Sequence, residues 1–257
     1  MNRGRIWLFS ASLANLLFLY LPIAVLIVFS FNASRLSATW QGFTFRWYLM
    51  LVEDQALLGA VENSLFVAVV STFMATMLGI SAAVGMERLP ARRRGTVEGA
   101  LLLPLVIPEV MMGVALLLFF VMMELPLSLV TVTIGHVVWN VPIVAVIVRA
   151  KLQKLDSRLL EAALDLGATP WRAFQRVTLP LLMPAVIGAV LMAFALSLDD
   201  FIVTFFTAGP GSTTLPLKVY SMVKSGVTPE INALSAILVL ISMALIGLSL
   251  VFQRQRS

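Results

Sequence analysis

The chain has 257 residues, of which 60% are hydrophobic and 12% charged, with a mean hydropathy of +0.98 and a formal net charge of +5. Soluble domains carry about 45–50% apolar and about 25% charged residues, so this composition indicates a membrane protein. The sequence has no cysteine and one histidine, which excludes disulfides, thiolate metal sites and histidine-cluster metal sites. It also lacks a Ser-His-Asp set and a phosphate-binding glycine loop, so we expect neither catalysis nor a bound cofactor.

Six apolar runs predict an all-α, polytopic protein with six transmembrane helices in one domain over residues 1–257. Each run is close to the ~20 residues that a helix needs to cross ~30 Å of hydrocarbon. The first is too long for the core of a signal peptide and is interpreted as an uncleaved span. The runs cover residues 7–31, 65–84, 100–123, 129–148, 181–206 and 233–252.

Lysine and arginine are unevenly distributed between the loops, and this predicts the orientation. If the N-terminus is cytoplasmic, 14 of the 18 basic residues lie on the cytoplasmic side, in the two tails and in the loops after the second and fourth runs. The positive-inside rule then places both termini in the cytoplasm. The basic run ERLPARRRG, residues 87–95, is interpreted mainly as part of this signal.

The two long outer loops carry distinct patterns. Residues 32–61 contain WQGFTFRWY, whose aromatic side chains we expect to pack at the membrane interface. Residues 207–232 contain a GPG turn and then LKVYSMVK, which predicts a short amphipathic helix lying over the membrane. Thr228 and Pro229 are typical of the N-cap and first position of a helix, so the last span is expected to begin there.

Between the fourth and fifth runs, the sequence predicts a pair of short helices. Leu159, Ala163 and Leu166 form a narrow apolar stripe at helical spacing. Gly167 suits the left-handed position that ends a helix, and Thr169 suits the N-cap of the next one. Pro180 is expected to end this second helix before the fifth run.

Two interpretations of this helix pair are open. Periodicity alone favours a hairpin that lies on the lipid and anchors the loop. Ala162 and Ala163 of Glu161-Ala162-Ala163 have small side chains, which favours a face that another protein approaches closely. A loop built only to lie on lipid would gain more from Leu or Phe at these positions.

The same segment resembles the signature loop of ABC importer permeases, EAA, three residues, Gly, nine residues, Ile-x-Leu-Pro. Glu161-Ala162-Ala163, Gly167 and Val177-Thr178-Leu179-Pro180 match that spacing, with Val in the Ile place. The resemblance implies a type I importer permease fold with a coupling loop at about residues 149–180. It also implies that Glu161, Ala162, Ala163 and Gly167 dock on a cytoplasmic ATPase dimer. The chain has no Walker motif, so ATP and Mg would be used by separate subunits.

Acidic residues inside the apolar runs mark a candidate substrate pathway. Asp199 and Asp200 lie within ALSLDDFIVTFF, read as one continuous helix. A carboxylate at mid-membrane costs about +2.5–3.5 kcal/mol even on the mildest scale, so such residues usually face a cavity. The alternative is that one aspartate pairs with a polar group on a neighbouring helix.

A third acid and an aromatic residue complete the candidates. Glu109 follows Pro104 and Pro108, which interrupt the third run, so it either faces the pathway or only caps a restarted helix. Trp139 suits an ammonium by cation–π contact. His136 and Asn140 flank it, and such residues are more often interhelical hydrogen-bonding groups than ligands.

Most of the chain is similar to the second permease of spermidine/putrescine importers. The similarity is carried by SFNASR, WQGFTFRWY, EAALDLGATPWR, SLDDF and GPGSTTLPLKVYSMVKSGVTPEINALS. It implies a multi-pass protein of the bacterial inner membrane that is surrounded by lipid and binds no nucleic acid. The implied partners are a periplasmic polyamine-binding protein, a second, different permease and the ATPase dimer. The implied pathway residues are Asp199, Asp200, Glu109 and Trp139.

Other functions stay open at this point. A permease for another small cationic or organic solute shares parts of these motifs. An ion-coupled secondary transporter or channel would use the buried acids for ions and leave the helix pair without a role. A structural membrane protein gives no reason for paired buried aspartates.

Overall fold

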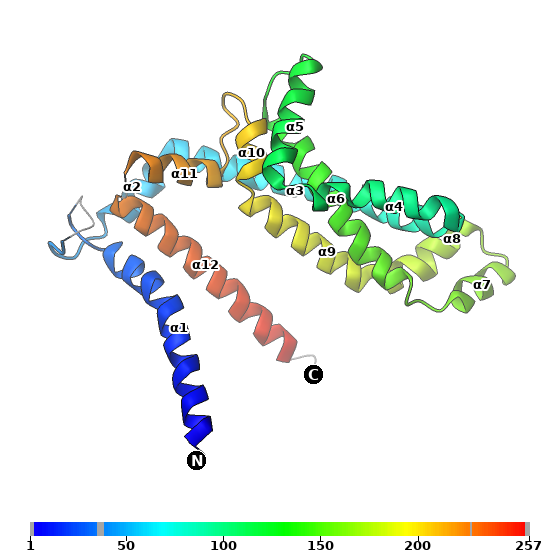
Figure 1. The fold of residues 1–257 in the computed structure, drawn as a ribbon, viewed down its shortest axis with the longest axis horizontal. Helices are drawn as coiled ribbons and strands as arrows, with labels where there is room; N and C mark the ends of the chain where they lie inside the picture. The colour runs from blue at the N-terminus through cyan, green and yellow to red at the C-terminus, as the bar shows by residue number, and fades with distance from the viewer. Residues whose placement is uncertain (1–2, 35–38, 227, 255–257) are drawn as a thin grey trace. The chain divides into compact units, whose positions relative to one another are not determined.

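The computed structural model describes residues 3–34, 39–226 and 228–254, and these residues are helical apart from loops and one isolated bridge between Asn32 and Phe43. Contacts divide the chain into two compact units, Met1–Leu58 with Val219–Ser257, and Gly59–Lys218. Figure 1 shows the elements in order. They are α1 (Arg3–Phe29), α2 (Arg46–Glu53), α3 (Gln55–Glu87), α4 (Ala91–Val106), α5 (Glu109–Met122), α6 (Leu129–Leu152), α7 (Ser157–Asp165), α8 (Pro170–Ala173), the π-helical turn η1 (Phe174–Thr178), α9 (Leu179–Asp199), α10 (Ile202–Thr207), α11 (Leu215–Ser225) and α12 (Pro229–Arg254).

Four helical stretches of the described residues are long and apolar enough to cross a membrane. They are Trp7–Phe29, Gln55–Glu87, Leu129–Leu152 and Pro170–Asp199. The predicted third span is a broken pair, Arg92–Val106 and Glu109–Met122, bent by 103°. The predicted interruption is confirmed at Pro108, between the two helices, whereas Pro104 lies inside α4. The all-α prediction is therefore confirmed, and the count of six spans and the orientation stay predictions.

The first unit contains the loop that follows α1, which is tied together by Asn32. The Asn32 side-chain amide donates to the Thr39 carbonyl at 2.7 Å, and its Oδ1 accepts from the Gln41 N–H at 2.9 Å. The Asn32 carbonyl accepts from the buried indole of Trp47 at 2.7 Å. The SFNASR and WQGFTFRWY motifs thus specify one folded loop, to which Phe31, Phe43, Phe45 and Tyr48 add a cluster of ring contacts.

The second unit is built on close contact between α3, α6 and α9. Ala75, Gly79 and Ala83 repeat every four residues on α3, and the two alanines belong to a buried cluster that includes Val144 and Leu182. Small residues at this spacing let helix backbones approach, which is how helices associate where lipid removes the hydrophobic driving force.

An ion-pair network fastens three helix ends in the second unit. Glu87, at the end of α3, pairs with Arg149 of α6 at 2.9 Å and with Arg94 of α4 at 3.5 Å. Arg149 also pairs with Glu98 of α4. The basic run of residues 87–95 therefore contributes packing contacts in addition to its predicted effect on orientation.

The loop between α10 and α11 is fixed to α3 by hydrogen bonds. The Asn63 amide donates to the carbonyls of Gly211 and Thr213, and the Ser64 hydroxyl accepts from the Leu215 N–H at 2.7 Å. The predicted turn and the short helix after it are both present, as α11. The GPGSTTLP motif is thus held against α3 by these hydrogen bonds.

Gly79 gives a direct test of the helix packing. A Cβ built at Gly79 lies 2.7 Å from the Val144 Cβ, whereas a Cβ at Gly188 meets no atom within 4 Å. We expect Gly79→Ala to destabilise the purified protein by about 1–3 kcal/mol, because overpacking forces the backbones apart. Gly188→Ala should leave the midpoint of thermal unfolding in lipid nanodiscs unchanged or slightly raised. Equal midpoints for the two variants would contradict this packing.

Candidate functional site

The predicted fifth span is broken at its acidic pair, and this corrects the expectation of a continuous helix. α9 ends at Asp199, Asp200 is extended with φ −66° and ψ 121°, and α10 begins at Ile202. The Asp200 carboxylate accepts the backbone N–H groups of Val203 at 3.3 Å and Thr204 at 2.8 Å. A carboxylate on the first N–H groups of a helix explains why the chain restarts there, because those donors have no partner within the helix.

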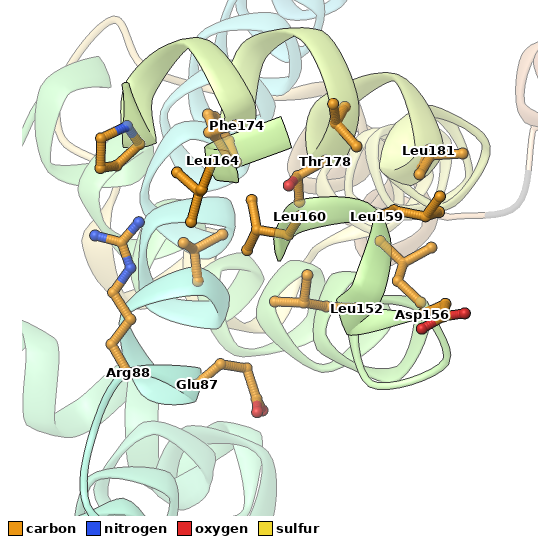
Figure 2. A pocket seen from close by; sticks show the side chains of 14 residues that line it. Glu87, Arg88, Leu152, Asp156, Leu159, Leu160, Leu164, Phe174, Thr178 and Leu181 are labelled. Atoms are coloured by element: carbon orange, nitrogen blue, oxygen red, sulfur yellow. The ribbon is translucent and has the colours of Figure 1, made fainter. Parts of the chain in front are cut away.

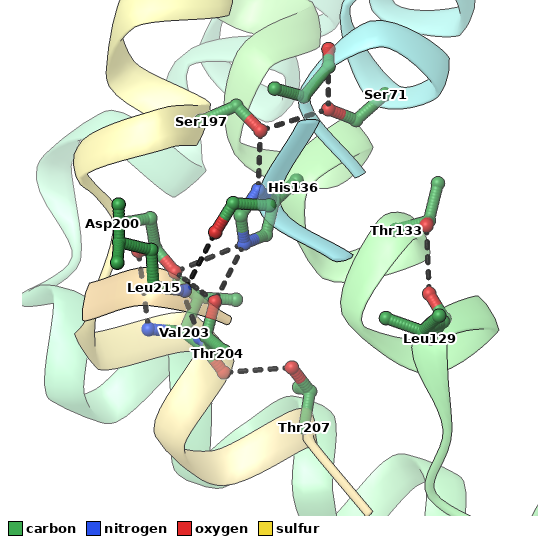
Figure 3. Close-up of polar contacts among 12 residues, drawn as sticks. Ser71, Leu129, Thr133, His136, Ser197, Asp200, Val203, Thr204, Thr207 and Leu215 are labelled. Atoms are coloured by element: carbon green, nitrogen blue, oxygen red, sulfur yellow. Dashed lines mark hydrogen bonds and ion pairs between the residues drawn. The ribbon is translucent and has the colours of Figure 1, made fainter. Parts of the chain in front are cut away.

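Asp200 is also bound to the fourth predicted span. The His136 Nε2 lies 3.0 Å from Asp200 Oδ2, with both side chains buried. The Thr204 hydroxyl donates to the same oxygen at 2.8 Å. On the other side of the ring, His136 Nδ1 lies 2.6 Å from the Ser197 hydroxyl of α9. Figure 3 shows these side chains joined in one network. The expectation that His136 hydrogen-bonds between helices is confirmed.

Two glycines bring α10 close enough for this network to form. A Cβ at Gly135 would lie 2.7 Å from Val203 Cγ1, and a Cβ at Gly113 would lie 2.5 Å from the ring of Phe206. α10 therefore packs directly against α6 and α5. In the sequence these close contacts correspond only to two isolated glycines in apolar helices. Two isolated glycines are not enough to predict the packing of α10.

The remaining pathway candidates have different surroundings. Asp199 is exposed at the end of α9, in contrast to its neighbour Asp200. Glu109 is in the first turn of α5, as its helix-restart interpretation requires, and its carboxyl group interacts electrostatically with the Asp200 carboxyl group. Trp139 is half-buried and borders the same small space as His136 and Asp200. The structure thus brings together Glu109, Asp200 and Trp139, with Asp199 adjoining them.

Asn140 does not form the interhelical hydrogen bonds that His136 forms. Its side chain is buried, and neither amide atom has a hydrogen-bond partner within the described part of the chain. Asn140 therefore packs inside the protein as a buried residue of α6. Its predicted interhelical hydrogen bond is not formed within the described residues.

The helix pair after α6 has the predicted turns. α7 ends in a Schellman motif, in which the Ala168 N–H donates to the Ala163 carbonyl at 3.1 Å and the Gly167 N–H to the Leu164 carbonyl at 2.9 Å. Gly167 has φ +82°, the left-handed conformation that glycine adopts without strain. Thr169 caps the next helix, with its hydroxyl accepting from the Arg172 N–H at 3.3 Å.

The predicted apolar stripe of α7 is wrong at Leu166, which lies at the C-cap of the helix. Leu166 is 90% exposed, whereas Leu159, Leu160 and Leu164 line a cavity of about 440 Å³ together with Phe174. Figure 2 shows these side chains around that space. The stripe failed because helix α7 is only nine residues long and turns its Leu160 and Leu164 side toward the second helix. Glu161 and Ala162 are left exposed, Ala163 is half-buried, and Gly167 is exposed.

Pro180 does not end the second helix, which corrects another expectation. α8, η1 and α9 run on as one helical stretch, Pro170–Asp199. A proline inside an α-helix clashes with the carbonyl four residues before it. The π-helical turn at Phe174–Thr178 widens the helix just ahead of Pro180, so the chain passes this point without a break.

Comparison with known proteins gives the family. Residues 75–255 match the family model described as "Binding-protein-dependent transport system inner membrane component". The chain is 40% identical over 240 residues to "Spermidine/putrescine transport system permease protein PotC" of Escherichia coli (strain K12), covering 93% of this chain and 91% of that protein. It is 42% identical over 249 residues to "Putrescine transport system permease protein PotI" of the same organism, covering 94% and 88%.

Solved structures agree on the fold. A chain from a bacterial ABC transporter involved in the import of the acidic polysaccharide alginate has a TM-score of 0.76 at 17% identity, covering 98% of this chain and 96% of that one. A chain of the MetNI methionine ABC transporter has a TM-score of 0.64 at 20% identity, covering 80% and 95%. The chain belongs to the family of inner-membrane components of binding-protein-dependent transport systems, the permeases of ABC importers.

Proposed function

We propose that this chain is one permease subunit of an ATP-driven importer that moves polyamines across the inner membrane. The observation that carries the proposal is the acidic cluster at the break between α9 and α10. Glu109 and Asp200 interact electrostatically there. Two carboxylates that share a site repel unless a proton or a cation lies between them. The names of the 40–42% identical relatives support spermidine and putrescine as the cations.

The surroundings of the cluster suit an extended polyamine. Asp199 is exposed one residue before Asp200, so a second ammonium group of the same molecule has a second carboxylate available. Trp139 offers an aromatic face for cation–π contact. No lysine or arginine falls within the central part of an apolar run to oppose a cation. We assign Asp199, Asp200, Glu109 and Trp139 to the substrate pathway on these grounds.

The proposed importer contains further subunits besides this chain. A periplasmic polyamine-binding protein would deliver the substrate, and a second, different permease would complete the pathway. A cytoplasmic dimer of ATPase subunits would hydrolyse ATP with Mg, while this chain is a membrane subunit without catalytic activity or cofactor of its own. The family description and the importer structures of the same fold support this arrangement.

The helix pair after α6 is proposed as the coupling segment, residues 149–180. Its exposed face carries Glu161 and Ala162, beside Ala163 and the Gly167 turn, so it offers small side chains to the ATPase. The second helix continues into α9 as one stretch, Pro170–Asp199, which ends at the acidic cluster. A displacement imposed on the coupling segment by the ATPase would therefore reach the substrate pathway along a continuous helix.

The substrate pathway is tested by removing its charge. We expect Asp199→Asn with Asp200→Asn to abolish ATP-dependent spermidine uptake by proteoliposomes that contain the whole importer, because the amides attract no ammonium group. The importer should still assemble, as judged by co-purification of the ATPase. Glu53→Gln, at the end of α2, is the matched control and should keep normal uptake. Normal uptake by the double variant would remove these aspartates from the pathway.

The coupling segment is tested by enlarging its small face. Ala162→Leu with Ala163→Leu should lower ATP-dependent uptake at least about tenfold, because added side chains keep the ATPase surface from approaching. Ala100→Leu, at an exposed position of α4, is the control and should transport normally. If the double variant still binds the ATPase and transports at the wild-type rate, this segment is not the coupling element. Uptake that persists without ATP hydrolysis would favour an ion-coupled transporter instead.

A further inference from the structure

We infer that His136 is the positioning residue of the acidic cluster, fixing the Asp200 carboxylate so that Oδ2 is fully engaged and Oδ1 is left for a cation. The inference deepens the proposed function and rests on it. Its basis is the set of contacts that His136 makes on both sides of the break between α9 and α10.

The two oxygens of Asp200 are bound very unequally. Oδ2 accepts from the Thr204 N–H at 2.8 Å and from the Thr204 hydroxyl at 2.8 Å, and His136 Nε2 lies 3.0 Å away. Among the hydrogen bonds of the described residues, Oδ1 accepts only the longer one, from the Val203 N–H at 3.3 Å. An ionised carboxylate offers about four acceptor positions in all, so the capacity that remains is mainly on Oδ1.

The hydrogen-bond directions are consistent along the whole network. With a proton on Nε2, His136 donates to Asp200 Oδ2, and its Nδ1 forms a hydrogen bond with the Ser197 hydroxyl, 2.6 Å away. The Ser197 oxygen then accepts from the Ser71 hydroxyl of α3, 3.1 Å away. Nε2 also lies 2.9 Å from the Thr204 Oγ1. Every donor finds an acceptor when Nε2 carries a proton, so the network places a proton on Nε2. Figure 3 shows the chain running from Ser71 to Asp200.

His136 joins the two helices at the break to a third one. Its ring lies on α6, Ser197 precedes the break on α9, and Asp200 and Thr204 follow it. Where the helix is broken, the φ and ψ angles of Asp200 and Phe201 are not held by a helical hydrogen-bond ladder. His136 supplies that restraint from a neighbouring helix. The acid that interacts with this group is Glu109 on α5, and Asp199 is exposed at the end of α9, one residue before Asp200.

Two substitutions of His136 separate the contacts of its two ring nitrogens, Nδ1 with Ser197 and Nε2 with Asp200 and Thr204. Glutamine reaches the place of Nε2 and can still donate to Asp200, whereas asparagine reaches only the place of Nδ1 and keeps the contact with Ser197. The matched control is Thr133→Ala, because Thr133 is buried on the same helix and its hydroxyl bonds, among the residues that the structure describes, only to the Leu129 carbonyl of its own turn. The readout is the number of spermidine molecules taken up per ATP hydrolysed by the reconstituted importer.

A positioning role predicts a specific pattern in that ratio. His136→Asn should lower it at least about tenfold, since a hydrogen bond to a charged group is lost, while His136→Gln and Thr133→Ala should stay within about twofold of the wild type. A purely structural role would lower uptake and ATP hydrolysis together and leave the ratio unchanged. An unchanged ratio in His136→Asn, or an equal loss in His136→Gln, would overturn the inference.

A stability cycle tests the contact without relying on transport. His136→Ala and Asp200→Ala should each lower the midpoint of thermal unfolding of the purified importer, and the double variant should lose clearly less than the sum, because the two residues share one interaction. Additive losses would overturn the inference even if polyamine uptake is normal. If the wild-type importer takes up no polyamine, the proposed function fails, while this cycle still decides whether His136 positions Asp200.

Discussion

The contact between His136 and Asp200 is the interaction on which the site depends. A backbone break in an apolar segment leaves N–H and C=O groups without partners, and lipid offers none. Here Asp200 covers the first N–H groups of α10, and His136 holds Asp200 in that position from α6. The carboxylate is therefore both the structural solution to the break and part of the proposed cation pathway. The need to satisfy the N–H groups at the break explains why an acidic residue is tolerated inside an apolar segment.

The second constraint is the continuity of the helix that leads to this break. The stretch Pro170–Asp199 begins within the proposed coupling segment and ends at the acidic cluster. Thirty residues at ~1.5 Å each span roughly 45 Å, enough to cross the hydrocarbon and reach into the aqueous layer. The π-helical turn preserves this continuity at Pro180. The Glu87–Arg149 pair, together with the small residues of α3, holds the helices beside it in register.

The sequence was sufficient for features that depend on local chemistry. Hydropathy identified the helices, Gly167 and Thr169 identified the turn between α7 and α8, and Pro108 marked the bend before Glu109. It was insufficient where a contact between residues far apart in the sequence determines the end of a helix or the face that it buries. The break at Asp200 depends on His136, 64 positions earlier, and Leu166 is exposed because tertiary packing selects another face of α7. Continuity through Pro180 depends on a π-helical turn that no residue pattern announces.

The central claim is that the second helix of the coupling segment, which begins at Pro170, and the end of α9 at Asp199 move as parts of one helix. The chain has no cysteine, so spin labels can be attached at Gln175→Cys and Leu196→Cys without background labelling. The account predicts a single distance of roughly 30 Å, from a rise of ~1.5 Å per residue, in the importer with and without ATP bound. A distance that changes between the two states, or a broad distribution in either, would contradict it.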